Sequence, residues 1–230
     1  MNLQLLRTRV LVTGSFLINF GCQLYGMLTR PNMKEVADAN HFAFSPNPFF
    51  IAAFFAMQVV LQLYWIKNLF IVNSVTLAQP EYTNEPEPTQ VAYAPIYALG
   101  NLCIAAWMVF WTKEWFWAAQ AMVTINTLIQ LYAVYYLLGI YYSPFAPSMY
   151  NMSTHLVAKT FAGISVLDFL DNGAVAVGYL GPPSVPVQIL TVVLFIRLAV
   201  SSDTAFRLCI LYDILALLVG QPTWRPALAT

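Results

Sequence analysis

The sequence predicts an all-α fold: an integral membrane bundle of about seven transmembrane helices in a single domain over residues 1–230. Hydrophobic residues make up 60% of the chain, charged residues only 9%, and the mean hydropathy is +0.66. Soluble globular domains carry about 25% charged residues. Apolar runs of about 20 residues, the length that crosses a bilayer core, recur along the chain and are separated by proline-rich or charged breaks.

Seven segments are expected to be membrane helices on this basis. They are 9–29, 47–72, 92–112, 115–138, 155–180, 185–202 and 204–221. The connections carry helix breakers, namely Pro31, SPNP at 45–48, QPEYTNEPEP at 79–88, SPFAP at 143–147 and GPPSVP at 181–186. The boundary between the last two helices rests on SSDTAF, which fits either a tight turn or a polar break in one long helix.

The charges of the chain exclude one class of partner. Ten basic and ten acidic residues cancel to a formal net charge of zero, so there is no basic field to hold nucleic acid. The segment at about 74–90 is acidic and rich in proline, which predicts a solvated surface loop. The partners that this composition favours are membrane lipids and a protein partner within the membrane.

Charged residues inside the predicted helices are costly and usually face the bundle interior with a partner. If the last two helices form a hairpin, Arg197 and Asp213 lie at similar depths, which predicts an ion pair. Two roles are open for this pair: a structural clasp between helices, or a gate or ligand anchor. Asp203 and Arg207, four residues apart at the turn, are expected to form a surface pair.

His155 and Lys159 are four residues apart near the start of the fifth predicted helix, so they share one helix face. One interpretation is that Lys159 extends to the membrane interface as an anchor. The other is that the two residues form a polar cluster that recognises an anionic head group, with His155 making it sensitive to pH.

A deeper acidic pair lies in VLDFLDNGAVAVGYL at 166–180. Asp168 and Asp171 are three apart on one side of the helix, and Asn172 is next to Asp168 by its four-residue spacing. Lys159 is about 180° away from Asp168 around the helix, so it cannot pair with it. Donors must come from other helices or from a ligand. The candidates on other helices are Gln58, Gln62, Asn101, Gln120, Asn126 and Gln130.

Several chemistries lack their usual residues in this sequence. The last predicted helix has no lysine for a retinal Schiff base, and neither HExxH nor a GxGD pair of aspartates is present. The three cysteines lie at unrelated spacings without a CxxC pair. The sequence therefore predicts no metal site and no particular cofactor, and it gives little support to an enzyme.

Four segments resemble the tryptophan-rich sensory protein (translocator protein) superfamily, in particular its seven-helix relatives. They are HFAFSPNPFFIAAFF, NLCIAAWMVFWTKEWFWAAQ, FAGISV and DTAFRLCILYDILALLVGQ. The resemblance implies an all-helical bundle with a lipophilic pocket, since the five-helix members bind tetrapyrroles or sterols. The chain departs from those members in its extra helices and in lacking their first loop rich in Pro and Trp, so the ligand class does not carry over.

The leading functional prediction is a membrane protein that binds or moves a small lipophilic or amphipathic molecule in a cavity among the second to fifth helices. The predicted lining is Asp168, Asp171, Asn172, Asn101 and Trp107. Two alternatives remain open. One is a structural or accessory subunit whose polar groups only hold helices together. The other is an ion-coupled or proton-coupled transporter in which Asp168 or Asp171 titrates.

Overall fold

The computed structural model describes residues 3–71, 88–139 and 143–224, and within these ranges the chain is helical with no strand. The helices are α1 (Leu3–Leu28), α2 (Met33–Ala39), α3 (Pro48–Asn68), α4 (Pro88–Thr112), α5 (Phe116–Tyr132), α6 (Met152–Val177), α7 (Val185–Val200) and α8 (Thr204–Gly220). A π-helical turn at Ala133–Leu137 continues α5, and a 3₁₀ turn at Pro222–Trp224 follows α8.

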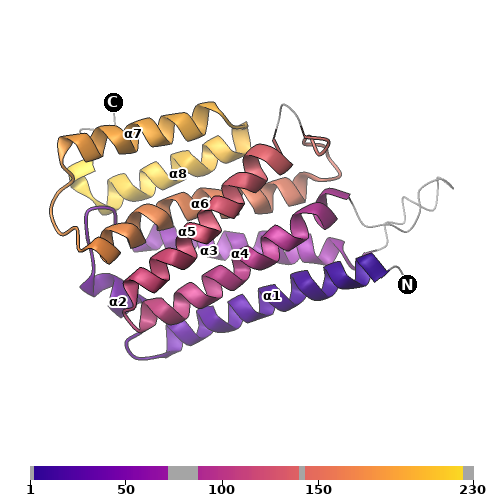
Figure 1. Cartoon of the computed structure of the whole chain (residues 1–230), viewed down its shortest axis with the longest axis horizontal. Helices are drawn as coiled ribbons and strands as arrows, with labels where there is room; N and C mark the ends of the chain where they lie inside the picture. The colour runs from indigo at the N-terminus through magenta and orange to yellow at the C-terminus, as the bar shows by residue number, and fades with distance from the viewer. Residues whose placement is uncertain (1–2, 72–87, 140–142, 225–230) are drawn as a thin grey trace.

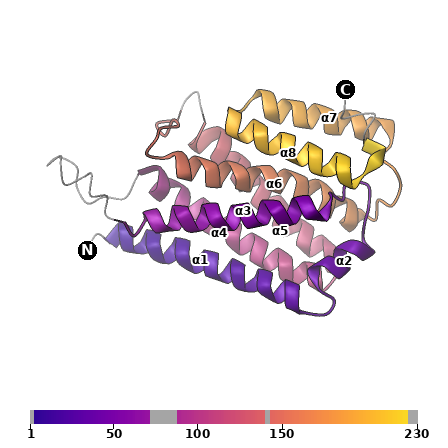
Figure 2. The same cartoon turned by 180° about the vertical axis from the view of Figure 1, so that it is seen from behind.

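The long helices lie roughly side by side, with α1 at one edge and α7 at the other (Figure 1). Seen from behind, α3 covers the face between α1 and α6 (Figure 2). Helix α6 is the centre of the packing because it contacts α3, α4, α5 and α8, while α4 also packs against α1. Any group on the inner faces of α6 is therefore surrounded by other helices.

Four helices are long and apolar enough to cross a membrane: α1, α3, α4 and α6. The distribution of side chains agrees with an apolar surrounding. Large hydrophobic residues are exposed on the outer faces, for example Leu17, Val60 and Ile189, whereas amides such as Gln58, Asn101 and Gln130 are buried. Soluble proteins show the reverse tendency for amides, which are mostly exposed there. Interior polar groups and an apolar surface are what a bilayer requires.

Local sequence explains where several helices begin and end. Asn47 caps α3 through its side chain, and Pro48 occupies the first turn, where a missing N–H costs nothing. Helix α6 ends at Gly178, whose φ of 65° lies in the left-handed region that glycine tolerates. Asp203 caps α8 by accepting a hydrogen bond from Phe206 N at 3.1 Å. The SSDTAF segment is therefore a turn between two separate helices.

Each of the seven predicted segments overlaps one of the long helices, with shifted ends. Helix α1 begins six residues before the predicted start, and α4 begins at Pro88 rather than at 92. Most of the predicted loop at 74–90 lies outside the described residues, and its last three residues belong to α4. The sequence prediction missed α2, although its Asn32 and Glu35 form a reciprocal capping box that the N-x-x-E spacing signals.

Two glycines set the close approach of helices around α6. A Cβ built on Gly163 would lie 2.5 Å from Cys209 Cβ, so α6 and α8 meet without room for a side chain. A Cβ on Gly100 of α4 would lie 2.3 Å from Gln130 Nε2 of α5. Small residues at helix contacts permit this packing within membranes, where no hydrophobic effect drives helices together.

Candidate functional site

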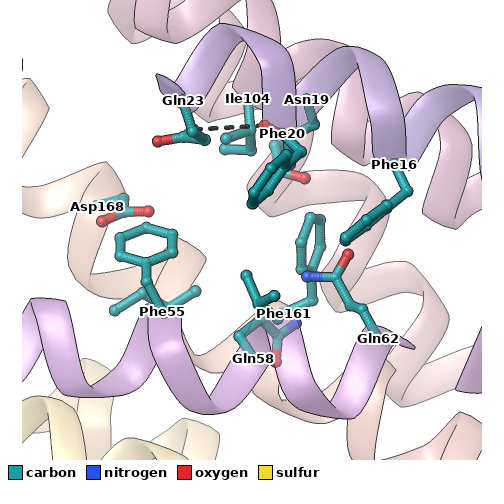
Figure 3. Close-up of a pocket in the computed structure, with 13 residues that line it drawn as sticks. Phe16, Asn19, Phe20, Gln23, Phe55, Gln58, Gln62, Ile104, Phe161 and Asp168 are labelled. Atoms are coloured by element: carbon teal, nitrogen blue, oxygen red, sulfur yellow. Dashed lines mark hydrogen bonds between the residues drawn. The ribbon is translucent and has the colours of Figure 1, made fainter. Parts of the chain in front are cut away.

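A small cavity of about 50 Å³ lies between α1 and α3, with α4, α5 and α6 behind it (Figure 3). Its position follows from helical spacing. Phe55, Gln58 and Gln62 occupy one face of α3 at intervals of three and four residues, and Phe161 and Asp168 lie seven apart on α6. Phe16, Asn19, Phe20 and Gln23 form the facing stripe of α1. Polar and phenyl side chains therefore alternate around one space.

Most of the amide oxygens around the cavity already accept hydrogen bonds from other side chains of the protein. Gln58 Oε1 accepts from Thr160 Oγ1 at 2.5 Å, and Gln62 Oε1 accepts from Tyr97 OH at 2.6 Å. Asn19 Oδ1 accepts from Gln23 Nε2 at 3.3 Å. The nitrogen of Gln58 differs, because it is buried and has no hydrogen-bond partner among the described residues. The packed wall beside the cavity thus contains a buried hydrogen-bond donor without an acceptor among the described residues.

Asp168 supplies the one acidic group in the cavity lining, to which Phe55 of α3 also belongs (Figure 3). Within the described part of the chain it forms neither an ion pair nor a hydrogen bond. Asp171 does not line the cavity. Its Oδ1 accepts a hydrogen bond from Ser45 Oγ at 2.8 Å, in the segment before α3. Of the two aspartates predicted to line the cavity, Asp168 therefore has no partner within the described residues, and Asp171 is hydrogen-bonded to Ser45.

Asp213 is a third carboxyl near this region. It is completely buried in α8, and in the described residues neither of its oxygens has a hydrogen-bond partner. It is close enough to Asp168 for the two groups to interact electrostatically. Burying a polar group without a partner costs about 1–3 kcal/mol. Such a cost usually points to a functional reason, an unseen water or an ion.

The predicted ion pair between Arg197 and Asp213 is wrong. Arg197 is exposed in the last turn of α7, whereas Asp213 faces the interior beside α6. The two residues match in depth, but depth does not fix the direction in which each side chain leaves its helix. Long basic side chains near a helix end extend outward toward water.

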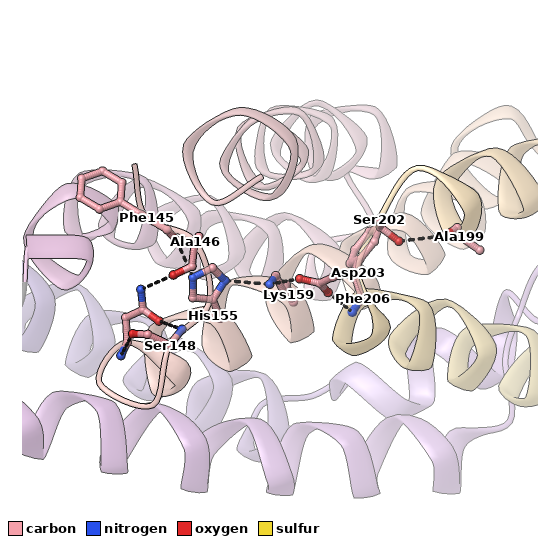
Figure 4. Close-up of polar contacts among 10 residues, drawn as sticks. Phe145, Ala146, Ser148, His155, Lys159, Ala199, Ser202, Asp203 and Phe206 are labelled. Atoms are coloured by element: carbon pink, nitrogen blue, oxygen red, sulfur yellow. Dashed lines mark hydrogen bonds and ion pairs between the residues drawn. The ribbon is translucent and has the colours of Figure 1, made fainter. Parts of the chain in front are cut away.

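The actual buried ion pair joins Lys159 of α6 to Asp203 at the start of α8 (Figure 4). Lys159 is 2% exposed, so it does not extend to the interface as an anchor. Its Nζ also donates to His155 Nδ1 at 2.7 Å, and His155 Nε2 then donates to Phe145 O at 2.9 Å. We call Phe145, His155, Lys159 and Asp203 the end network.

The expected pair between Asp203 and Arg207 is also wrong. Asp203 is occupied by Lys159 and by the N–H of Phe206, while Arg207 Nε donates to Ala199 O at 3.0 Å. Helical spacing placed His155 and Lys159 together correctly. It gave no signal for Asp203, because that contact depends on how the α7–α8 turn packs against α6.

Asn101, Trp107 and Asn172 hold helices together instead of lining the cavity. Asn172 accepts from Trp107 Nε1 at 3.0 Å and donates to Gln120 Oε1 at 2.8 Å, which joins α4, α5 and α6. Asn101 accepts from Asn19 Nδ2 at 2.7 Å and donates to Tyr97 O at 2.9 Å. Of the five predicted lining residues, Asp168 alone lines the cavity.

Sequence reasoning missed the contribution of α1. Asn19 and Gln23 are four residues apart in an otherwise apolar run, which is the same stacked pattern that marked Gln58 and Gln62 on α3. Reading both stripes would have indicated two polar faces opposed across one space. The pairing of α1 with α3 needs the tertiary structure.

A larger hollow of about 500 Å³ lies beside the π-helical turn and the α7–α8 turn. Tyr135, Arg197, Ser201 and Asp203 are among the residues that line it. Two of its hydroxyl groups are engaged with the protein: Tyr135 OH donates to Leu198 O at 2.9 Å and Ser201 Oγ donates to Arg197 O at 2.6 Å. It is a wide surface groove rather than an enclosed cavity.

No family model, curated protein or solved structure matches this chain. The resemblance to the tryptophan-rich sensory protein superfamily stays a prediction.

Proposed function

We propose that the chain is a multi-pass membrane protein in which all seven long helices cross the bilayer. Helices α5, α7 and α8 have 17, 16 and 17 residues. At 1.5 Å per residue these lengths come to roughly 25 Å, somewhat less than the hydrocarbon thickness of about 30 Å. The π-helical turn lengthens α5, and α7 and α8 run alongside α6, which supports a common membrane-spanning layer (Figures 1 and 2).

We propose that the protein binds a small amphipathic molecule that enters from the lipid phase between α1 and α3. The observation that carries this proposal is the Asp168 carboxyl, which forms no ion pair or hydrogen bond within the described residues and lines a cavity walled by phenyl rings. The polar end of the ligand would meet this carboxyl. The apolar remainder would lie between Phe16, Phe20 and Phe55.

The size and mouth of the cavity define how such a ligand fits. Sites that enclose a whole drug-sized molecule measure about 300–1,000 Å³. A volume of about 50 Å³ accommodates only a head group of a few atoms. Phe20 is exposed and Phe55 is half-buried, so the wall toward the surrounding lipid is apolar. The cavity therefore favours a single-chain amphipath over a bulky tetrapyrrole or sterol.

Photo-crosslinking with alkyl diazirine probes in mild detergent tests this proposal. We expect single-chain amphipaths to label peptides of α1 and α3, and Asp168→Asn to lower labelling several-fold. Asp171→Asn is the matched control, because it makes the same change three residues away, where the carboxyl is held by Ser45. Equal labelling of all three proteins, or none, would contradict the proposal and leave an accessory structural role.

Asp213 favours a second candidate function, a transporter coupled to protons. A buried carboxyl without a partner inside a membrane is the kind of group that carries a proton, and Asp168 is near enough to interact with it. Proton flux into liposomes that contain the purified protein, measured with a pH-sensitive dye, tests this candidate. Loss of flux in Asp168→Asn and Asp213→Asn would support coupling, and unchanged flux in both variants would contradict it.

A further inference from the structure

The surface groove beside the α7–α8 turn contains one charge that the protein does not balance. Arg197 and Asp203 are the two charged residues in its lining. Asp203 is paired with Lys159 of α6 and also caps α8, so its charge is already compensated (Figure 4). Arg197 is exposed and forms no ion pair within the described part of the chain. The groove therefore presents a guanidinium without a counter-charge.

The chemistry of a guanidinium selects the ligand. It carries five N–H donors in a planar fork, which matches the oxygens of a phosphate group in pairs. The hydroxyls of Tyr135 and Ser201, which also line the groove, donate to the backbone carbonyls of Leu198 and Arg197. Arg197 is thus the side chain of the groove that is suited to hold an anion.

The groove lies where helices end. Arg197 is in the last turn of α7, and α8 begins at Thr204, directly after the turn. The π-helical turn at Ala133–Leu137 forms the other wall, and such turns occur often at functional sites. If α7 and α8 cross the bilayer, this end lies at the depth of the lipid head groups. Tyr135 and Tyr136 in the lining fit that depth, where tyrosine is enriched.

An apolar stripe on α7 runs from Arg197 toward the middle of the helix. Leu190 and Val193 lie seven and four residues before Arg197, so the three residues share one helix face. Leu190 is 68% exposed and Val193 is 56% exposed. Helix α7 lies at the edge of the bundle (Figure 1). An acyl chain attached to a phosphate at Arg197 would cover this stripe, whereas a free phosphate ion would leave it bare.

We infer that the groove binds the phosphate of an anionic glycerophospholipid. The phosphate lies against the Arg197 guanidinium, and an acyl chain lies along Leu190 and Val193. A groove of about 500 Å³ accommodates the glycerophosphate head group, since ligand sites typically measure about 300–1,000 Å³. Basic sites between membrane helices hold anionic head groups in this way. The inference rests on the part of the proposed function that places α7 and α8 in the bilayer, and it is independent of the Asp168 cavity.

Photolabelling in liposomes tests the inference. The full chain is reconstituted in phosphatidylcholine with a trace of one of two probes, phosphatidylglycerol or phosphatidylcholine, that carry the same diazirine-labelled acyl chain. Mass spectrometry then quantifies the labelled peptides of α7. We expect phosphatidylglycerol to label α7 about fivefold more than phosphatidylcholine, because a basic residue near the surface favours an anionic lipid by about 1 kcal/mol.

Two variants locate the group that recognises the head group. Arg197→Gln should bring the ratio of the two probes on α7 close to one. Arg7→Gln is the matched control, because Arg7 is an exposed arginine near the start of α1, at the opposite edge of the bundle from α7 (Figure 1). It should leave the ratio unchanged. A ratio that survives Arg197→Gln, or that falls equally in both variants, would overturn the groove as the site.

Inorganic phosphate distinguishes a lipid site from a site for the free ion. Phosphate and chloride at equal ionic strength should lower the ratio equally, because they screen charge alike and phosphate has no acyl chain. A selective loss of the ratio in phosphate would overturn the lipid assignment in favour of a free-ion site.

The same labelling separates this inference from the proposed function. Equal labelling of α7 by both probes on the unmodified chain would overturn the head-group site, while α7 would still face lipid as proposed. Failure of both probes to label α7 would overturn its place in the bilayer. Both results come from the unmodified chain, so neither depends on the folding of a variant.

Discussion

The end network and the Asp168 cavity lie about two turns apart on α6, yet they treat buried charge in opposite ways. In the end network, Lys159, His155, Asp203 and the carbonyl of Phe145 satisfy one another. At the cavity, Asp168 and the buried nitrogen of Gln58 have no hydrogen-bond partner within the described residues. The first arrangement holds α6 to α8, and the second leaves hydrogen-bonding groups unmatched.

The difference shows how to distinguish a structural polar group from a binding group inside a membrane. Both regions contain buried charge, and burial alone does not separate them. A closed set of donors and acceptors stabilises the contact between helices. Unmatched groups that share a cavity cost stability, and proteins tolerate this cost mainly where function requires it. Substitutions in the two regions should therefore change stability in opposite directions.

The largest expected effect comes from breaking the end network. Lys159→Met leaves Asp203 without its cation and should lower the free energy of unfolding by about 3 kcal/mol, since breaking a buried ion pair typically costs 3–5 kcal/mol. Adding Asp203→Asn should recover part of the loss, because Asn still caps α8. Unfolding in mixed detergent micelles measures both proteins. Strict additivity of the two single changes would show that the pair contributes nothing.

The packing between α6 and α8 supports both regions, and Gly163 tests it. Gly163→Ala places a Cβ 2.5 Å from Cys209 Cβ, so the helices must separate. We expect a loss of about 1–3 kcal/mol, as for other overpacked sites. Gly14→Ala in α1 is the matched control, because nothing lies within 4 Å of its Cβ position. Equal thermal stability of the two variants would contradict the close approach.

Hydropathy and turn residues are enough to predict the long helices, because an apolar helix satisfies the hydrogen bonds of its own backbone. Proline-rich breaks located the connections, and the cap at Asp203 now explains why SSDTAF separates α7 from α8. Helix α2 was not predicted because it is short and polar, although Asn32 and Glu35 carry its capping signal. How many helices cross the membrane remains a proposal beyond the four that are long and apolar enough.

Replacing a carboxyl should have opposite effects at Asp213 and Asp203. Asp213→Val removes a buried group whose oxygens have no partner in the described residues, so we expect a gain of about 1 kcal/mol. Asp203→Val removes both the partner of Lys159 and the cap of α8, and it should destabilise the protein. The same unfolding measurement compares the two. A loss at Asp213 would mean that its carboxyl has a stabilising partner, such as a bound water.

The site was harder to predict than the fold, because spacing along one helix fixes neighbours only within that helix. Helical spacing correctly predicted that His155 lies beside Lys159 and that Lys159 does not pair with Asp168. Helical spacing could not show that Gln58 and Asp168 would line the same cavity, since that depends on the rotation of α3 against α6. The amides that it assigned to the lining, Asn101 and Asn172, bond to neighbouring helices instead.

The smallest expected change in stability is at Arg197. This prediction tests whether two residues at the same depth in neighbouring helices also point toward each other. Arg197→Gln removes an exposed cation and should change stability by no more than about 0.5 kcal/mol, as for most surface substitutions. An ion pair with Asp213 would make the same change cost about 3–5 kcal/mol, because a buried carboxylate would lose its cation. A loss of that size, abolished by Asp213→Asn in the same chain, would restore the pair and remove Asp213 from the unpartnered groups near the cavity.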